Sequence, residues 1–206
     1  MIFYYAPKTV SLASHIALEE ASAKYESKKL DFFATEQRSD EYLQINPKGR
    51  VPALDTGEGI ISETPAILTY IAQTFPSANL APLNDPFKFA KMQEFNAYLA
   101  STVHVNHAHK FRGTRWTDDE SAIETMKAKV PQTMHDSFEL IENNMFAGPW
   151  VLGENYSVCD GYVFCISLWL KGDSVDINDF PKIAKHNTRM LGRASVQTLL
   201  PIYGLS

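Results

Sequence analysis

The spacing of apolar residues changes along the first third of the chain, alternating between the periods of strands and of helices. Short apolar runs predict strands at 2–5, 25–33, 51–55 and 59–61. Apolar residues three and four positions apart predict helices at 11–23, 40–43 and 65–75. Together these segments predict the order β-α-β-α-β-β-α, which is typical of a mixed α/β domain.

A different pattern begins at Pro76, where three prolines fall within eleven residues and indicate a linker. Beyond it, apolar residues keep helical spacing from Met92 to Val103 and from Ile123 to Ile141. Shorter helices are predicted at 158–171 and 181–199. We therefore expect three parts, an α/β domain at 1–77, a linker at 78–86 and an all-α domain at 87–206.

Composition limits the kinds of partner. The chain has 206 residues, of which 45% are hydrophobic and 21% charged, and its formal net charge is −5 with scattered basic residues. Such a chain favours neither nucleic acid nor an anionic membrane as its partner. No apolar run is long enough to span a bilayer, and the N-terminal MIFYY lacks the features of a signal peptide. Cys159 and Cys165 fit neither a disulfide framework nor a CxxC pair, so we expect buried thiols in a cytoplasmic protein.

The first candidate binding motif is Glu63-Thr64-Pro65, at the start of a predicted helix. Thr64 is a suitable N-cap, and Pro65 suits the first helical position. A helix N-terminus also attracts a carboxylate, and Glu63 beside it can pair with an ammonium group. The motif therefore indicates either a well-capped helix alone or a site for an amino-acid-like group.

A second motif, Arg50-Val51-Pro52-Ala53, follows a loop that contains glycine. A proline at the start of a strand after such a loop is a candidate for a cis peptide bond. That bond would turn the N–H and C=O of Val51 outward, where an extended peptide can pair with them. The alternative is an ordinary proline in an edge strand.

A third motif lies between Gly153 and Asp160. Ser157 and Asp160 have the spacing of a capping box, with an acidic side chain in place of the usual Glu or Gln. We interpret this motif as structural, because it would begin a buried helix. Replacing Asp160 is expected to harm folding before it harms chemistry.

Taken together in this order and separation, these motifs resemble those of the cytosolic glutathione S-transferases. The resemblance covers nearly the whole chain and implies a thioredoxin-like N-terminal domain followed by an all-helical domain. Tyr4-Tyr5-Ala-Pro7, followed by Ser-Leu-Ala-Ser-His-Ile from Ser11, looks closest to the bacterial Beta class. The resemblance implies a cytosolic homodimer that acts in detoxification, uses glutathione as co-substrate and holds no tightly bound cofactor.

The resemblance also implies roles for individual residues. Val51, beside a cis-Pro52, would hold the backbone of the glutathione cysteine, with Arg50 close by. Glu63 and Thr64 would hold its γ-glutamyl end. The basic residue that the family carries after its second strand is missing here, so Arg50, Lys48 or Gln37 would compensate for it in gripping glutathione.

One departure from the Beta class concerns the start of the first helix. Where Beta-class enzymes carry a cysteine, this chain has Val10, and no other thiol lies in this half. We therefore expect hydroxyl groups to stabilise the glutathione thiolate, with Ser11 and Thr9 ranked together and Tyr5 behind them. Each hydroxyl of the pair has an alternative role in capping the helix.

Three histidines crowd the segment from Val103 to His109. By resemblance, His104 matches a histidine that reaches into the active cleft. We expect a second-substrate pocket around Tyr5 and His104, with further lining by His107, Phe111 and Trp116. A metal site is disfavoured, because His109 lies on a different helix face from the other two histidines and no carboxylate is near in sequence.

The expected activity is conjugation of glutathione to small apolar or aromatic electrophiles. Two alternatives stay open. One is a glutathione-dependent reductase of disulfides or peroxides, and the other is a non-catalytic binding protein with the same fold.

Overall fold

The computed structural model describes residues 1–205 of the chain. Its first half contains seven main elements: β1 (Ile2–Tyr5), α1 (Ser11–Glu20), β2 (Glu26–Lys29), α2 (Asp40–Ile45), β3 (Ala53–Asp55), β4 (Ile60–Ser62) and α3 (Thr64–Thr74). This order is the one that the apolar pattern predicts, so the thioredoxin-like fold class is confirmed.

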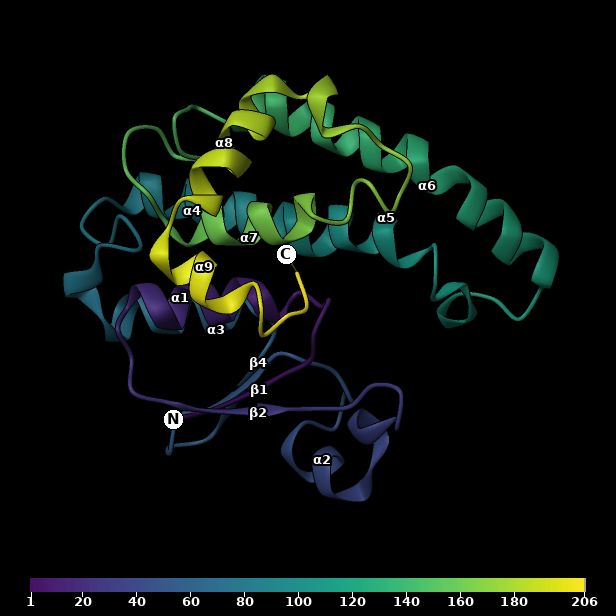
Figure 1. Cartoon of the computed structure of the whole chain (residues 1–206), viewed down its shortest axis with the longest axis horizontal. Helices are drawn as coiled ribbons and strands as arrows, with labels where there is room; N and C mark the ends of the chain where they lie inside the picture. The colour runs from purple at the N-terminus through teal and green to yellow at the C-terminus, as the bar shows by residue number, and fades with distance from the viewer. Residues whose placement is uncertain (206) are drawn as a thin grey trace.

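The four strands form one mixed sheet in the order β2-β1-β3-β4, in which β1 runs parallel to β2 and antiparallel to β3. Helices α1 and α3 lie on one face and α2 lies on the other (Figure 1). Because side chains alternate along a strand, β1 contributes to both faces. Phe3 and Tyr5 belong to the main core, whereas Tyr4 packs against Tyr42 of α2.

Strand β2 is shorter than the predicted strand at 25–33. Its pairing with β1 ends where Tyr5 lies opposite Lys29, and the Leu30 N–H then donates to the Tyr5 carbonyl at 2.8 Å. The chain turns at Asp31, whose Oδ1 accepts the N–H of Phe33 at 2.8 Å. Side-chain hydrogen bonds of this kind compete with sheet pairing, which explains the early end of the strand.

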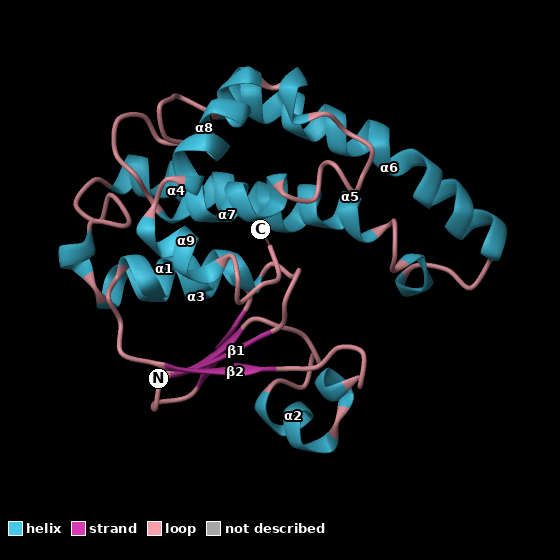
Figure 2. Cartoon of the chain, in the orientation of Figure 1, coloured by secondary structure: helices cyan, strands magenta, loops and turns pink. Residues whose placement is uncertain are grey.

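The second half is helical, as predicted (Figure 2). Its helices are α4 (Pro86–Tyr98), α5 (His104–Ala108), α6 (Glu120–Leu140), α7 (Val158–Ser167), α8 (Pro181–Leu191) and α9 (Ala194–Leu199). π-Helical turns at Leu99–Val103 and Ile141–Met145 join α4 to α5 and extend α6. Within residues 1–205, no helix has both the length and the apolar character that crossing a membrane requires.

Helix α7 is the central element of this half, since all of its residues from Val158 to Ser167 are buried. It packs against α1 and so joins the two halves (Figure 1). The predicted capping box is present at its start and is confirmed: the side chain of Ser157 accepts a backbone N–H of the first turn, and Asp160 accepts the Ser157 N–H at 2.7 Å.

The predicted helix at 181–199 is broken into α8 and α9 at Gly192 and Arg193. The backbone of Arg193 is extended, and its guanidinium group forms two hydrogen bonds of 2.6 Å with the Glu20 carboxylate of α1. The break redirects α9 across α1, so that the last residues pack on the first half (Figure 1). Helical spacing alone did not reveal this change of direction.

His15 of α1 is only 2% exposed and contacts the C-terminal segment, with Nδ1 3.2 Å from the Tyr203 hydroxyl. Burial lowers the pKa of His15 to about 4. Because an unfolded chain restores a pKa of about 6.5, the unfolded state binds more protons between these values. Stability is therefore expected to fall as the pH drops from about 6.5 towards 4, by about 3 kcal/mol from His15 alone.

Urea unfolding measured across this pH range checks the prediction. In His15→Phe, the free energy of unfolding is expected to fall less steeply between pH 6.5 and 4. Tyr203→Phe is the control, because it keeps the buried histidine and removes only its hydrogen-bond partner, so the pH dependence should persist. An unchanged slope in His15→Phe contradicts the assignment.

Candidate active site

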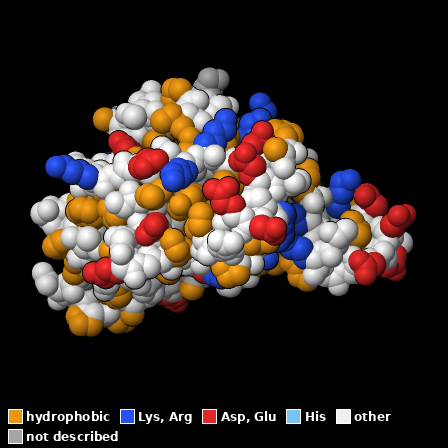
Figure 3. All heavy atoms as spheres, turned by 90° about the horizontal axis from the view of Figure 1, so that it is seen from below, with side chains coloured by type: hydrophobic (Ala, Val, Ile, Leu, Met, Phe, Trp, Pro, Cys, Tyr) orange, Lys and Arg blue, Asp and Glu red, His pale blue; other side chains and the backbone are white. Residues whose placement is uncertain are grey.

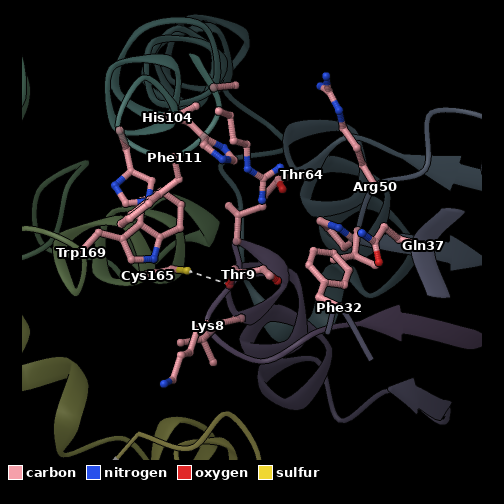
Figure 4. Close-up of a pocket in the computed structure, with 18 of the residues that line it drawn as sticks. Lys8, Thr9, Phe32, Gln37, Arg50, Thr64, His104, Phe111, Cys165 and Trp169 are labelled. Atoms are coloured by element: carbon pink, nitrogen blue, oxygen red, sulfur yellow. Dashed lines mark hydrogen bonds between the residues drawn. The ribbon is translucent and has the colours of Figure 1, made fainter. Parts of the chain in front are cut away.

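A cavity of about 1060 Å³ lies between the two halves of the chain. The first half lines it with loops at the ends of strands and with the starts of α1 and α3. The second half lines it with α5, the segment 111–116, one face of α7, the residues around Trp169 and the C-terminal segment at 203–205. Figure 4 shows Thr9 and Thr64 between Arg50, Gln37 and Phe32 on one side and His104, Phe111 and Trp169 on the other. This volume is large enough for a small peptide together with a second molecule.

Val51 and Pro52 both line the cavity, and the peptide bond between them is cis, as the sequence predicts. The N–H and C=O of Val51 form no hydrogen bond with any other described residue. The preceding carbonyl of Arg50 is held by the Tyr42 hydroxyl and the Asn46 amide, each at 2.7 Å. Loop contacts therefore fix a backbone edge whose polar groups are available to an extended peptide.

Glu63 and Thr64 line the cavity at the start of α3, although Thr64 does not cap the helix as the sequence suggests. The cap position is Glu63, with a backbone φ of 83°, and its side chain makes no capping hydrogen bond. Since a non-glycine residue rarely adopts this conformation, the site imposes it at some cost. Thr64 thus keeps its hydroxyl for a ligand, next to the free N–H groups of the helix.

Three polar side chains were expected to help grip a glutathione molecule, and they occupy different places. Arg50 and Gln37 line the cavity, but Lys48 lies outside it. Lys48 instead pairs with the Glu63 carboxylate at 2.6 Å. Its effect on a ligand is therefore indirect, through Glu63.

At the start of α1, the hydroxyl groups of Thr9 and Ser11 lie in different environments, although the sequence analysis ranks them together. Thr9 lines the cavity, whereas Ser11 is fully buried and does not. Thr9 Oγ1 donates to the Ala6 carbonyl at 2.7 Å and lies 2.8 Å from Ser11 Oγ, which we therefore assign as the donor to Thr9. The Val10 N–H has no acceptor in the part of the chain that the structure describes, so Thr9 and this N–H are the groups that the cavity can use.

Tyr5 does not line the cavity, which argues against its proposed role as a donor and as part of the second-substrate pocket. It shares a face of β1 with Phe3, and its ring packs against His15 and Tyr203. Burial raises the pKa of its hydroxyl. The period of the strand, which turns alternate side chains to the same face, accounts for this placement.

The second half of the chain brings one thiol to this site, which the sequence did not place there. Cys165 of α7 lines the cavity, and its Sγ lies 3.7 Å from the Thr9 carbonyl. The side chain is 1% exposed, and burial raises its pKa to about 12. A thiol that stays protonated and enclosed is a poor nucleophile, so Cys165 acts here as a small apolar side chain. Cys159 is also buried and free.

His104 lines the cavity, and its ring packs against Trp169. Burial lowers its pKa to about 4, with smaller contributions from the positive charges of His107, Arg112, Arg115 and Arg50. The ring is therefore neutral at neutral pH. It can donate or accept a hydrogen bond but supplies no charge.

His107, Phe111 and Trp116 also line the cavity, in agreement with their expected place in a second-substrate pocket. His107 is anchored by a partner that the sequence does not reveal, since its Nδ1 lies 2.6 Å from the buried carboxylate of Asp173. Its ring stacks on Trp169 with 4.3 Å between ring centroids. From Met1 to Leu205, no group of three or more His, Cys, Asp or Glu side chains is placed to hold a metal ion.

The sequence motifs did not identify several lining residues, because no local pattern shows which side chains of a loop or helix face a cavity. The missed aromatic and acidic side chains are Trp169 and Asp173, and the missed basic ones are Lys8, Arg38, Arg112 and Arg115. The one available signal was the alternation of aromatic and basic residues in the segment Phe-Arg-Gly-Thr-Arg-Trp at 111–116.

Comparisons with known proteins agree with this architecture. Residues 1–73 match the family described as glutathione S-transferase, N-terminal domain. The chain is 28% identical to glutathione S-transferase GstA of Escherichia coli O157:H7, with 100% of both chains covered. A glutathione transferase homologue from Sulfitobacter, solved with bound glutathione, is 44% identical, with a TM-score of 0.95 over 100% of this chain and 98% of its own. A beta-class glutathione S-transferase of Sphingomonas chungbukensis is 28% identical, with a TM-score of 0.86 and 100% of both chains covered.

Proposed function

The chain belongs to the glutathione S-transferase family, and on that premise we propose that it joins the sulfur of glutathione to a small electrophile with an apolar or aromatic body. The proposal rests on one observation: a single cavity is lined, in order, by groups that can bind each part of the tripeptide. These groups are the free backbone edge at Val51, the start of α3 at Thr64 and the start of α1 at Thr9.

In the proposed complex, the γ-glutamyl carboxylate lies at the start of α3, where Thr64 and the helix N–H groups face it. Glu63 faces the ammonium group of the same residue. The cysteinyl backbone pairs with the N–H and C=O of Val51 in the manner of an added strand. Arg50 lies on the same side of the cavity as Gln37 and is available for the remaining carboxylate (Figure 4).

The sulfur then lies at the start of α1, where the enclosed and protonated thiol of Cys165 does not compete with it. The Val10 N–H, the Thr9 hydroxyl and the positive end of the α1 dipole favour the thiolate over the thiol. The thiolate attacks the electrophile directly, so that the reaction needs no protein nucleophile. His104, which is neutral, is close enough to the lining aromatic side chains to hydrogen-bond with the second substrate.

We also propose that the chain is of the Beta class, with Val10 at the position of the class cysteine, and that it acts as a homodimer in the cytoplasm. The proposed domains are residues 1–77 and 87–206, with a linker at 78–86. Similarity to the Sphingomonas chungbukensis enzyme over its whole length supports the class. Light scattering of the purified protein tests the dimer.

Glutathione binding measured by calorimetry, together with turnover of 1-chloro-2,4-dinitrobenzene, tests the proposed activity. Thr64→Val is expected to weaken glutathione binding by about tenfold, since it removes a hydrogen bond to a charged group worth roughly 1.5 kcal/mol or more. Thr74→Val, at the exposed end of the same helix, is the matched control and should bind normally.

The alternatives give different results. Turnover of hydroxyethyl disulfide without conjugation of any electrophile favours the reductase, and binding without either reaction favours a non-catalytic protein. Failure to bind glutathione at all contradicts every one of these functions.

A further inference from the structure

Basic side chains dominate the charged lining of the cavity. They come from both halves of the chain and are Lys8, Arg38, Arg50, Arg112 and Arg115. Among the described residues, none of these five forms a salt bridge or donates a side-chain hydrogen bond. The two acidic side chains of the lining already have partners, since Glu63 pairs with Lys48 at 2.6 Å and Asp173 with His107 at 2.6 Å. The cavity therefore has a surplus of positive charge.

Bound glutathione would neutralise only part of this surplus positive charge. Its two carboxylates and its thiolate are partly offset by its own ammonium group, and the start of α3 takes one carboxylate. In Figure 4, Arg50 lies on the side of Gln37 and Phe32, away from Phe111 and Trp169. Arg112 and Arg115 line the cavity from the same segment of the second half as Phe111 and Trp116, so we assign these two cations to the second-substrate pocket.

The cations of the pocket alternate with aromatic side chains that are unusually exposed. Phe111 is 72% exposed and Trp116 is 46% exposed, and both face the cavity together with Arg112 and Arg115. Such a surface presents flat apolar faces for a ring and guanidinium groups for a carboxylate, phosphate or sulfonate. Viewed from below, Lys and Arg side chains gather where the arm on the right joins the body, beside hydrophobic side chains (Figure 3).

From this arrangement we infer that the second substrate is an aromatic electrophile that carries an anionic group, held by Arg112 and Arg115 while its ring lies against Phe111 and Trp116. The inference rests on the proposed function and narrows its substrate class. The anionic group stands apart from the reacting carbon, which must reach the sulfur at the start of α1.

The pKa shifts of Arg112 and Arg115 agree with an anion-binding role for these two side chains. Burial lowers the pKa of Arg112, and the charges of Arg50 and Arg38 lower it further. Burial lowers the pKa of Arg115 to about 10, with further contributions from Arg112, Arg50 and Arg38. The lowered pKa values show that Arg112 and Arg115 lie in a field of positive charge, so a bound anion would relieve the repulsion between these guanidinium groups.

Ethacrynic acid and its methyl ester form a matched pair of probes. Both contain the same aromatic enone, and only the acid carries a carboxylate, at the end of the ring opposite the enone. In either reaction the glutathione thiolate forms a C–S bond with the terminal CH₂ carbon. The π electrons of the C=C bond move to the enolate, which then takes a proton from water, and no group leaves.

The experiment compares kcat/KM for the two probes in the wild type, in Arg112→Gln/Arg115→Gln and in Arg189→Gln. Each rate is divided by the uncatalysed rate, so that the intrinsic reactivity of the probes cancels. The wild type is expected to favour the acid about tenfold, because a hydrogen-bonded charge pair contributes roughly 1.5 kcal/mol. The double variant should lose this preference while it keeps turnover of the ester and binding of glutathione. Arg189 lies on α8 outside the cavity, so its variant should behave as the wild type.

Two outcomes overturn the inference. One is equal use of acid and ester by the wild type, and the other is a double variant that loses both probes equally or binds free glutathione less tightly, which would assign the two arginines to glutathione. If neither probe is turned over, calorimetry with the two pre-formed glutathione conjugates decides. Tighter binding of the acid conjugate, lost in the double variant, supports the anionic site even where the proposed catalysis fails, and equal binding overturns it.

Discussion

Asp160→Ala is expected to lower the free energy of unfolding by about 4 kcal/mol, because it removes a buried carboxylate on which three neighbouring groups depend. The carboxylate is fully buried at the start of α7. Its Oδ2 accepts the Ser157 N–H at 2.7 Å, and its Oδ1 accepts the Val151 N–H at 2.8 Å. Oδ1 also lies 3.1 Å from His186 Nε2. Alanine would leave these buried groups without a partner and would open a cavity at the same place.

Urea unfolding followed by circular dichroism measures the loss. Asp136→Ala, on the exposed face of α6, is the matched control and should change stability by less than about 0.5 kcal/mol. Ser157→Ala should cost about 1 kcal/mol, as for other N-cap residues. Asp160 does not line the cavity, so the fraction of the variant that remains folded should bind glutathione normally. A stable Asp160→Ala variant with impaired binding would refute the structural role.

Thr9→Val is expected to lower kcat/KM for conjugation by roughly 10- to 100-fold, since it removes a hydrogen bond to a charged sulfur worth about 1.5–3 kcal/mol. In the free protein the Thr9 hydroxyl donates to the Ala6 carbonyl at 2.7 Å. Rotation of the O–H bond redirects the proton to a bound thiolate, while Ser11 continues to donate to Thr9. The isosteric valine keeps the side-chain volume but removes the donor, together with the oxygen that accepts the Ser11 hydroxyl and N–H.

Titration of bound glutathione, followed by its thiolate absorbance, reports the effect directly. The pKa of the bound thiol should rise by about one unit or more in Thr9→Val. Ser11→Ala should have a smaller effect of about threefold on kcat/KM, because Ser11 acts only by positioning Thr9. Thr198→Val, on α9 outside the cavity, is the control. A larger effect in Ser11→Ala than in Thr9→Val would reverse the assignment.

Features that depend on neighbouring residues were predictable from the sequence. The capping box of Ser157 and Asp160 and the cis bond before Pro52 involve groups only a few residues apart, and both are present. The order of strands and helices followed from apolar spacing for the same reason, because each element forms its hydrogen bonds locally or with an adjacent strand. The boundaries were harder to predict where a side chain ended an element, as Asp31 does after β2.

The tertiary structure alone decided which of the predicted site residues face the cavity. Thr9, Ser11 and Tyr5 have similar chemistry in the sequence, but only Thr9 lines the cavity, because the period of β1 turns Tyr5 into the core and the first turn of α1 encloses Ser11.

Contacts between segments that are distant in the sequence could not be predicted from it either. Cys165 approaches Thr9, and Asp173 pairs with His107, across separations of 156 and 66 residues. The cluster of arginines also needs both halves, since Arg38 and Arg50 come from the first and Arg112 and Arg115 from the second. The sequence thus determined the elements and the groups that could hold glutathione. The charge and shape offered to the second substrate arise only where the two halves meet, because they depend on distances that no local pattern encodes.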